Sequence, residues 1–319
     1  VGLKPSYGLL SRHGIVSYAS SFDTVGVIAN SVECTMEALK VLAQRAEPTG
    51  SLDSTYSILP EEETRRLDNQ NDDHQQLSGI RIGIPSAFSV SEIPPSIREG
   101  WARTADVLRQ NGAKVQQLST DKISPLLVQG ALAAYYVLVS AEASSNLSRY
   151  DGFRYGVAAP HVSDAASGLT PLEQQYAATR TNGFGPEVAR RVLCGTSVLS
   201  SDRFHTHYEA AAKLRSVLAR QLHNVLSEDV DAILIPTALS LPPRLDIGEI
   251  DNTQMFANDI MTIPASLAGL PVLSVPIELP GEETIFKGGM SIVGPRLKET
   301  TVIRIGKALE MVKNNVTAH

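Results

Sequence analysis

Short apolar runs alternate with longer amphipathic stretches along the 319 residues of this chain. The chain opens on Val1, Gly2 and Leu3, which have the pattern of a buried strand closed by the turn residues that follow. Further apolar runs of strand length predict strands at 79–85, 114–118, 231–237, 271–277 and 288–294.

The longer stretches keep the spacing of amphipathic helices. They predict helices at 30–44, 96–111, 124–148, 200–226, 253–268 and 299–312. Asn30 and Glu33 have the spacing of a capping box at the start of the first one. A strand, a helix and a strand over 79–118 form a βαβ unit, which implies parallel strands and a right-handed crossover. The sequence therefore predicts an α/β fold with a mixed β-sheet and helices on its faces.

The stretch from 61 to 78 departs from this alternation because almost all of its residues are polar. We expect a solvated loop or linker there. A tail that binds a partner protein is the less favoured alternative.

Charge and composition narrow the function classes. The chain has 28 Lys and Arg against 34 Asp and Glu, a net charge of −6, which argues against a broad phosphate-binding surface of its own. It does not exclude a partner that holds nucleic acid. No run approaches the roughly 18 apolar residues of a membrane span, so we expect no membrane insertion. Cys34 and Cys194 are expected to be reduced, buried thiols of a cytosolic or organellar-matrix protein.

Motifs for metal or phosphate chemistry are absent from the sequence. His205 and His207 are two residues apart, so on a helix they point in different directions and cannot hold one ion. The glycine pairs at 183–185 and 288–290 lack the rest of a phosphate-binding loop. The serine pairs in 142–148 and 198–202 have no glycine neighbours to expose a nucleophile, so we assign them to helix surfaces and caps.

A family resemblance lies in long ordered segments. The opening, "VGLKPSYGLLSRHGIVSYASSFDTVGVI", resembles the segment after the Gly/Ser-rich core of the amidase signature family. The segments 133–156, 183–201 and 254–276 resemble one branch of it, the A subunits of glutamyl-tRNA(Gln) amidotransferases, and mitochondrial ones in particular. The resemblance covers the whole chain but only about the last two thirds of a family member. It implies one amidase domain over 1–319, with an amidase-signature-type mixed β-sheet covered by helices on both faces.

The catalytic groups of the family are a serine nucleophile, a second serine in a cis peptide and a lysine. The resemblance places all three upstream of Val1. We therefore expect no catalytic residue within these 319 residues and no catalysis by the chain alone.

The resemblance also implies a clamp for glutamine, which carries a carboxylate and an ammonium group. Arg191 would bind the carboxylate, Asp259 the ammonium, and Tyr136 would offer its hydroxyl group. Arg190 is an alternative to Arg191, because an alignment shift of one residue exchanges them. Each residue also has a plainer interpretation: a surface ion pair of Arg191 with Glu187, a solvated Asp259, and core packing of Tyr136. The run 200–210 departs from the family pattern. The resemblance therefore does not define the part of the pocket that this run would form.

The function that the resemblance implies is that of an amidase subunit releasing ammonia from glutamine. A B-type partner subunit, with a small C- or F-type subunit, would use ATP and Mg to convert Glu-tRNA(Gln) to Gln-tRNA(Gln). The tRNA would be held mainly by the partner, and this chain would bind no cofactor. The mitochondrial matrix is the expected compartment, with the cytoplasm as the alternative.

Two other functions stay open. The chain could be a non-catalytic scaffold for partner subunits, although loss of upstream strands would expose sheet edges and apolar faces. It could also be an amidase of small or fatty amides. Ammonia release from glutamine, but not from aliphatic amides, separates that alternative from the first function.

Overall fold

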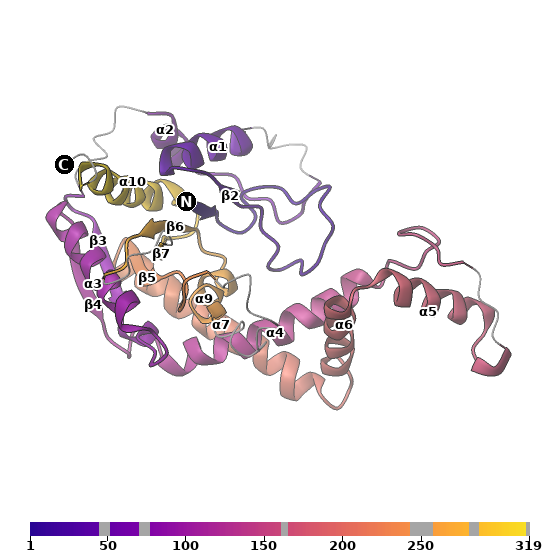
Figure 1. Cartoon of the computed structure of the whole chain (residues 1–319). Coiled ribbons are helices and arrows are strands. Elements are labelled where there is room, and N and C mark those ends of the chain that lie inside the picture. The colour runs from indigo at the N-terminus through magenta and orange to yellow at the C-terminus, as the bar shows by residue number, and fades with distance from the viewer. Residues whose placement is uncertain (45–51, 70–76, 161–164, 243–257, 281–286, 317–319) are drawn as a thin grey trace. The chain divides into compact units, whose positions relative to one another are not determined.

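The structure is a computed structural model that describes residues 1–44, 52–69, 77–160, 165–242, 258–280 and 287–316 (Figure 1). The chain divides into two compact units. Unit 1 comprises Val1–Gly14, Thr24–Ala133 and Leu214–His319, and unit 2 comprises Ile15–Asp23 and Ala134–Lys213. Each unit has its own packing and is described separately.

Unit 1 is built on a mixed seven-stranded sheet in the order β2-β1-β6-β7-β5-β3-β4. Strand β3 is parallel to both β4 and β5, whereas β5, β7, β6, β1 and β2 pair antiparallel in turn. The sequence prediction of a mixed α/β sheet, including the parallel βαβ unit, is thus confirmed. The strands are β1 (Gly2–Lys4), β2 (Val27–Ile28), β3 (Arg81–Pro85), β4 (Lys114–Leu118), β5 (Ala232–Pro236), β6 (Val272–Ile277) and β7 (Gly288–Val293).

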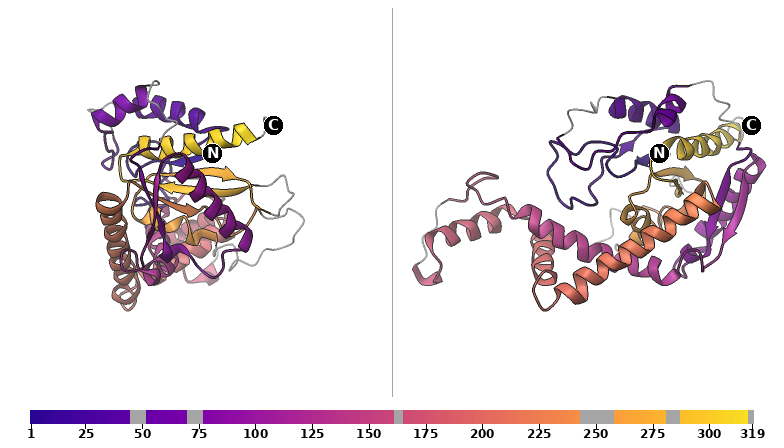
Figure 2. Two further views of the ribbon diagram at one scale, coloured as in Figure 1. Left: turned by 90° about the vertical axis from the view of Figure 1, so that its left-hand side faces the viewer. Right: turned by 180° about the vertical axis from the view of Figure 1, so that it is seen from behind.

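Helices cover both faces of this sheet, as expected (Figures 1 and 2). On one face, α10 (Glu299–Val316) packs on β6 and β7 and contacts α1 (Val32–Gln44) and α3 (Pro95–Gln110). On the other face, α7 (Glu209–Asn224) holds α9 (Ile263–Leu267) through hydrogen bonds to the carbonyl oxygens at its C-terminal end. Alternation along the strands produces these two apolar faces.

The polar stretch 61–78 is the main departure from the sequence prediction. Its first part is not a loop but the helix α2 (Glu61–Asp68), while residues 70–76 lie outside the described residues. Two exposed ion pairs four residues apart, Glu61–Arg65 and Glu62–Arg66, support the helix, and Leu67 is buried. A single buried leucine among charged residues gives too weak a periodicity to predict the helix.

Three smaller predictions were also wrong in detail, and part of a fourth lies outside the described residues. Helix α1 is capped by Ser31, whose Oγ accepts the N–H of Cys34 at 3.1 Å, rather than by Asn30. Cys34 and Cys194 are free but exposed, since each lies on the outer side of its helix. The helix expected over 200–226 begins with a π-helical segment, Phe204–Tyr208, and 253–257 of the helix expected at 253–268 lie outside the described residues.

The turn after β1 is tied to the start of α10. The backbone N–H of Ser6 donates to Glu299 Oε1 at 2.9 Å, and the N–H of Leu297 donates to Ser6 Oγ at 2.7 Å. Ser6 and Glu299 are both fully buried, and burial raises the pKa of the Glu299 carboxyl group. The N-terminal strand is therefore fixed by side chains as well as by its neighbours in the sheet.

Unit 2 is helical. It contains most of α4 (Pro125–Leu147), together with α5 (Pro171–Gly183) and α6 (Pro186–Val198). Among the described residues, α4 alone is long and apolar enough to cross a membrane. Seven apolar side chains of this helix are nevertheless buried in protein, which accounts for its composition as a core helix: Val128, Ala131, Ala134, Leu138, Val139, Ala141 and Ala143.

Candidate substrate-binding site

The guanidinium group of Arg191, on α6, lies in unit 2 between two tyrosine rings. Its Nε donates to Glu187 Oε1 at 2.9 Å, and a terminal nitrogen donates to the hydroxyl oxygen of Tyr18 at 3.1 Å. It also lies 5.4 Å from the ring centre of Tyr136 and 6.0 Å from that of Tyr18. These contacts use two of its five N–H groups, so three remain to hold an anion through the outer edge of the fork.

The electrostatics keep Arg191 charged. Burial acts to lower its pKa, but the hydrogen bonds to Glu187 and Tyr18 outweigh burial and raise the pKa above its ordinary value. The ion pair with Glu187 that helix spacing predicts is present as well. Arg191 therefore forms an ion pair with Glu187 and also contacts the rings of Tyr18 and Tyr136.

The neighbouring Arg190 has a different environment. Its side chain is 56% exposed against 22% for Arg191, and it pairs with the same carboxylate, that of Glu187. No tyrosine contact of Arg190 appears among the described residues. Of the two arginines, the geometry therefore places Arg191 beside Tyr136.

Close helix packing sets the position of Arg191 opposite Tyr136. A Cβ atom added to Gly195, on α6, would lie 2.0 Å from the carbonyl oxygen of Ser140, on α4. Gly195 follows Arg191 by one helical turn, and Ser140 follows Tyr136 by one turn. The small residue lets the two helices approach at this point, and the residues one turn earlier then face each other.

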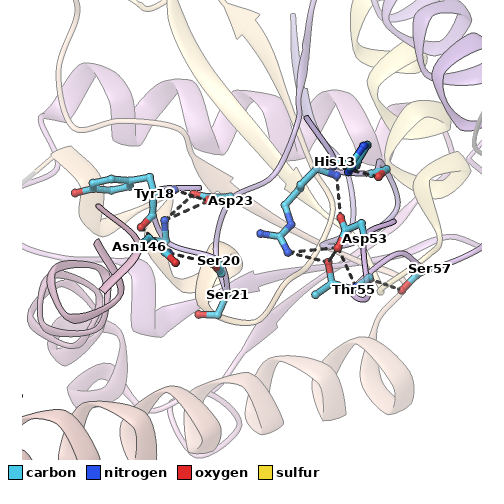
Figure 3. Close-up of polar contacts among 12 residues, drawn as sticks. His13, Tyr18, Ser20, Ser21, Asp23, Asp53, Thr55, Ser57 and Asn146 are labelled. Carbon is cyan, nitrogen blue, oxygen red and sulfur yellow. Dashed lines mark hydrogen bonds and ion pairs between the residues drawn. The ribbon is translucent and has the colours of Figure 1, made fainter. Parts of the chain in front are cut away.

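The loop that carries Tyr18 is held on one face of α4 (Figure 3). Asn146 Nδ2 donates to the carbonyl oxygen of Tyr18 and to Ser20 Oγ, both at 3.0 Å. Glu142, one turn earlier on α4, accepts the backbone N–H and the hydroxyl of Ser21. Asp23 closes the loop by accepting the backbone N–H of Tyr18 at 3.0 Å. A rigid backbone therefore holds the Tyr18 ring against Arg191.

Sequence reasoning missed Tyr18, which lies 173 residues from Arg191 along the chain. Spacing cannot reveal so distant a contact. A weaker signal was available in α4, where Glu142, the one charged residue of the helix, is followed four residues later by Asn146. Such a pair indicates a helix face that binds polar backbone.

The third predicted residue, Asp259, lies in unit 1, whereas Tyr136 and Arg191 lie in unit 2. It is half-buried in a short 3₁₀ segment, Asn258–Ile260, and its carbonyl oxygen accepts the N–H of Thr262 at 3.1 Å. Its role as the ammonium ligand stays a prediction.

A cavity of about 440 Å³ lies beside this segment in unit 1, and residues of β1, β5, β6, β7 and α9 line it. Its walls are mostly apolar. Thr237 Oγ1 lies within hydrogen-bonding distance of Ser274 Oγ at 2.8 Å and of Ser291 Oγ at 2.9 Å. Within the described part of the chain, no three His, Cys, Asp or Glu side chains are grouped to hold a metal ion.

Comparison with known proteins identifies the family of this chain. The family model described as Amidase matches residues 1–303. The chain belongs to the amidase family. This confirms the family resemblance of the opening segment and of the three later ones.

Similar proteins within the family share one description, the A subunit of glutamyl-tRNA(Gln) amidotransferase. The protein from Rhizorhabdus wittichii is 38% identical, over 97% of this chain and 58% of its own length. The mitochondrial protein from Emericella nidulans is 35% identical, over 97% of this chain and 65% of its own. The crystal structure of the Thermotoga maritima protein aligns with a TM-score of 0.66 at 29% identity, over 97% of this chain and 57% of that one. This chain thus spans about 60% of the length of these relatives.

Proposed function

We propose that Arg191 binds the carboxylate of glutamine in an amidase subunit of a tRNA-dependent amidotransferase. The observation that supports this is the guanidinium group itself, charged, half-buried and held by Tyr18 and Glu187 with three N–H groups still available. A planar fork with two parallel donors matches a carboxylate. The guanidinium group lies over the Tyr136 ring, 5.4 Å from its centre, and Tyr136 is proposed to offer its hydroxyl group to the same glutamine.

An amino acid substrate fits this site better than an aliphatic or fatty amide does. Simple amides have no carboxylate, so they would leave the three remaining N–H groups of Arg191 without an acceptor from the substrate. This argument, together with the names of the relatives, favours glutamine over small amides as the substrate. Binding of glutamine does not separate a catalytic subunit from a scaffold, whereas an assay of ammonia release does.

The remaining parts of the proposal follow from the family resemblance of the sequence. Ammonia released from glutamine would pass to a B-type subunit, assisted by a small C- or F-type subunit. That partner would use ATP and Mg to activate Glu-tRNA(Gln), consistent with the acidic balance of this chain. Relatives are both mitochondrial and bacterial, and we propose the mitochondrial matrix as the compartment.

Glutamine binding to the 319-residue chain tests the central step. We expect Arg191→Lys to weaken glutamine binding at least tenfold in isothermal titration calorimetry, because an ammonium group cannot make the bidentate contact. Arg190→Lys is the matched control, since it changes the adjacent arginine on the same Glu187, and we expect a change within twofold.

The compound 4-aminobutanamide, which is glutamine without its carboxylate, is the matched ligand. It should bind at least tenfold more weakly than glutamine to the unchanged chain. Equal binding of the two ligands, or equal losses for the two arginine variants, would exclude Arg191 as the carboxylate ligand.

A further inference from the structure

A second cavity, of about 350 Å³, lies in unit 1 outside the carboxyl ends of the parallel strands β3 and β4. Its lining comes from the end of β3, the segment Ser86–Ser89, the first half of α3, and Gln117 of β4. Strand β3 lies between its parallel neighbours β4 and β5. In open α/β sheets, ligands bind in crevices outside the carboxyl ends of the strands.

The charge in this cavity comes from Arg98, on α3. Helix α3 has two other arginines, and each has a carboxylate partner: Arg103 pairs with Glu99 and Arg109 pairs with Asp106. Arg98 instead donates to Ser89 Oγ at 2.9 Å and to the carbonyl oxygen of Val90 at 3.3 Å. No carboxylate lies within ion-pair distance of Arg98 in the described part of the chain.

The polar side chains of the cavity, Ser86, Ser89, Arg98 and Gln117, are exposed, and they add donors that a ligand can use in place of water. Arg98 retains three of its five N–H groups, and Ser89 retains its hydroxyl proton because it accepts from Arg98. Neither the hydroxyl of Ser86 nor the amide of Gln117 has a hydrogen-bond partner among the residues described. A site with one unneutralised cation and several donors suits an anion with acceptor oxygens.

The floor of the cavity is apolar. Trp101 is buried, and its Nε1–H is fixed to the carbonyl oxygen of Leu234 on β5 at 3.1 Å. Ile84 and Pro85 continue this surface at the end of β3. Because the indole N–H is already used, the ring offers only its apolar surface to a ligand.

We infer that this cavity binds a small organic carboxylate with an apolar body, gripped by Arg98 and packed on Trp101. The charge of Arg98 would bind the carboxylate, and the indole would bind the body. All of the residues involved lie in unit 1, so the inference does not depend on glutamine binding at Arg191.

The protein carries its own probe for this site, because Trp101 is the single tryptophan of the chain. Benzoate should change the emission of Trp101 saturably. Benzamide, its neutral analogue of nearly the same shape, should bind at least tenfold more weakly, because it lacks the charge that Arg98 complements.

Variants on one helix complete the test. Arg98→Gln should weaken benzoate binding at least tenfold, while Arg103→Gln, an exposed arginine on the same helix, should leave it within twofold.

The inference is overturned if benzamide binds as well as benzoate, or if Arg98→Gln has no effect. Absence of a saturable emission change would overturn it too. Tighter binding of inorganic phosphate than of benzoate would replace the carboxylate by a phosphate as the ligand class. The comparison of ligands on the unchanged chain holds even if a variant fails to fold.

Discussion

The Asp53 carboxylate accepts hydrogen bonds that hold a turn in unit 1 (Figure 3). Its ionisation makes the stability of the fold depend on pH. The carboxylate accepts the backbone N–H of Arg12 at 2.8 Å, and the backbone N–H and hydroxyl of Thr55 at 2.9 and 2.7 Å. Burial alone would raise its pKa, but the hydrogen bonds from Thr55 and Arg12 outweigh burial and lower the pKa to about 2. The ionised form is therefore the one that the folded state prefers.

We expect Asp53→Asn to lower the free energy of unfolding by about 1 kcal/mol at pH 7, after allowance for solvent screening. A depressed pKa stabilises the fold above the unfolded value of about 3.8, and this contribution is lost as the pH falls towards about 2. The deficit of the variant should therefore shrink between pH 4 and pH 2. Urea titrations across this range measure it.

Asp106→Asn is the control for this measurement. Its carboxylate is exposed and pairs with Arg109 alone among the described residues, so its deficit should be within about 0.5 kcal/mol at every pH. A pH-independent deficit at Asp53 would show that the turn depends on shape rather than on charge.

Among the elements, helices α4 and α6 carry the proposed binding residues, and their mutual distance is set by Gly195. Helices α4 and α6 pack this closely because Gly195 has no side chain. No other residue type allows the backbone of Ser140 to lie so close, and both Arg191 and Tyr136 depend on this contact for their mutual position.

Gly195→Ala should therefore lower the free energy of unfolding by about 1–2 kcal/mol, because the clash costs more than the gain in helix propensity. It should also weaken glutamine binding severalfold. Gly183→Ala, at the end of α5, is the matched control, since an added Cβ there meets no atom within 4 Å. Unchanged stability and binding in Gly195→Ala would show that the helices can separate without cost.

Elements with strong periodicity could be predicted from the sequence, and those fixed by distant partners could not. Strand β4 occupies the predicted residues 114–118, and α3 and α4 begin and end within one residue of the predicted bounds. Helix α2 was missed because its support is electrostatic: buried Glu63 accepts from Lys298 and Thr300, which are more than 230 residues away. The contact of Tyr18 with Arg191 escaped prediction for the same reason.

At the scale of the whole molecule, the family match and the strand pairing establish the amidase family and the mixed sheet of unit 1. The chain matches the amidase family over 1–303 and spans about 60% of the length of its relatives. The chain contains Arg191, the proposed ligand of the glutamine carboxylate. Glutamine binding can therefore be measured separately from ammonia release.

We expect the purified 319-residue chain to bind glutamine but to release no ammonia from it. An enzyme-coupled ammonia assay at saturating glutamine measures this, with the longer Rhizorhabdus wittichii relative as the positive control. Ammonia release that is lost in Arg191→Lys would contradict the expectation, because it would require a nucleophile within the chain itself.

The bond between Ser6 and Glu299 has a consequence for synthesis on the ribosome. The two residues are 293 positions apart. At translation rates of about 5–20 residues per second, Ser6 is synthesised roughly 15–60 s before Glu299. During that interval β1 also has no β6 beside it, and its exposed edge is open to pairing with other chains. Slower translation lengthens this exposure, so the yield of soluble protein should depend on protection of the nascent segment around β1 by chaperones.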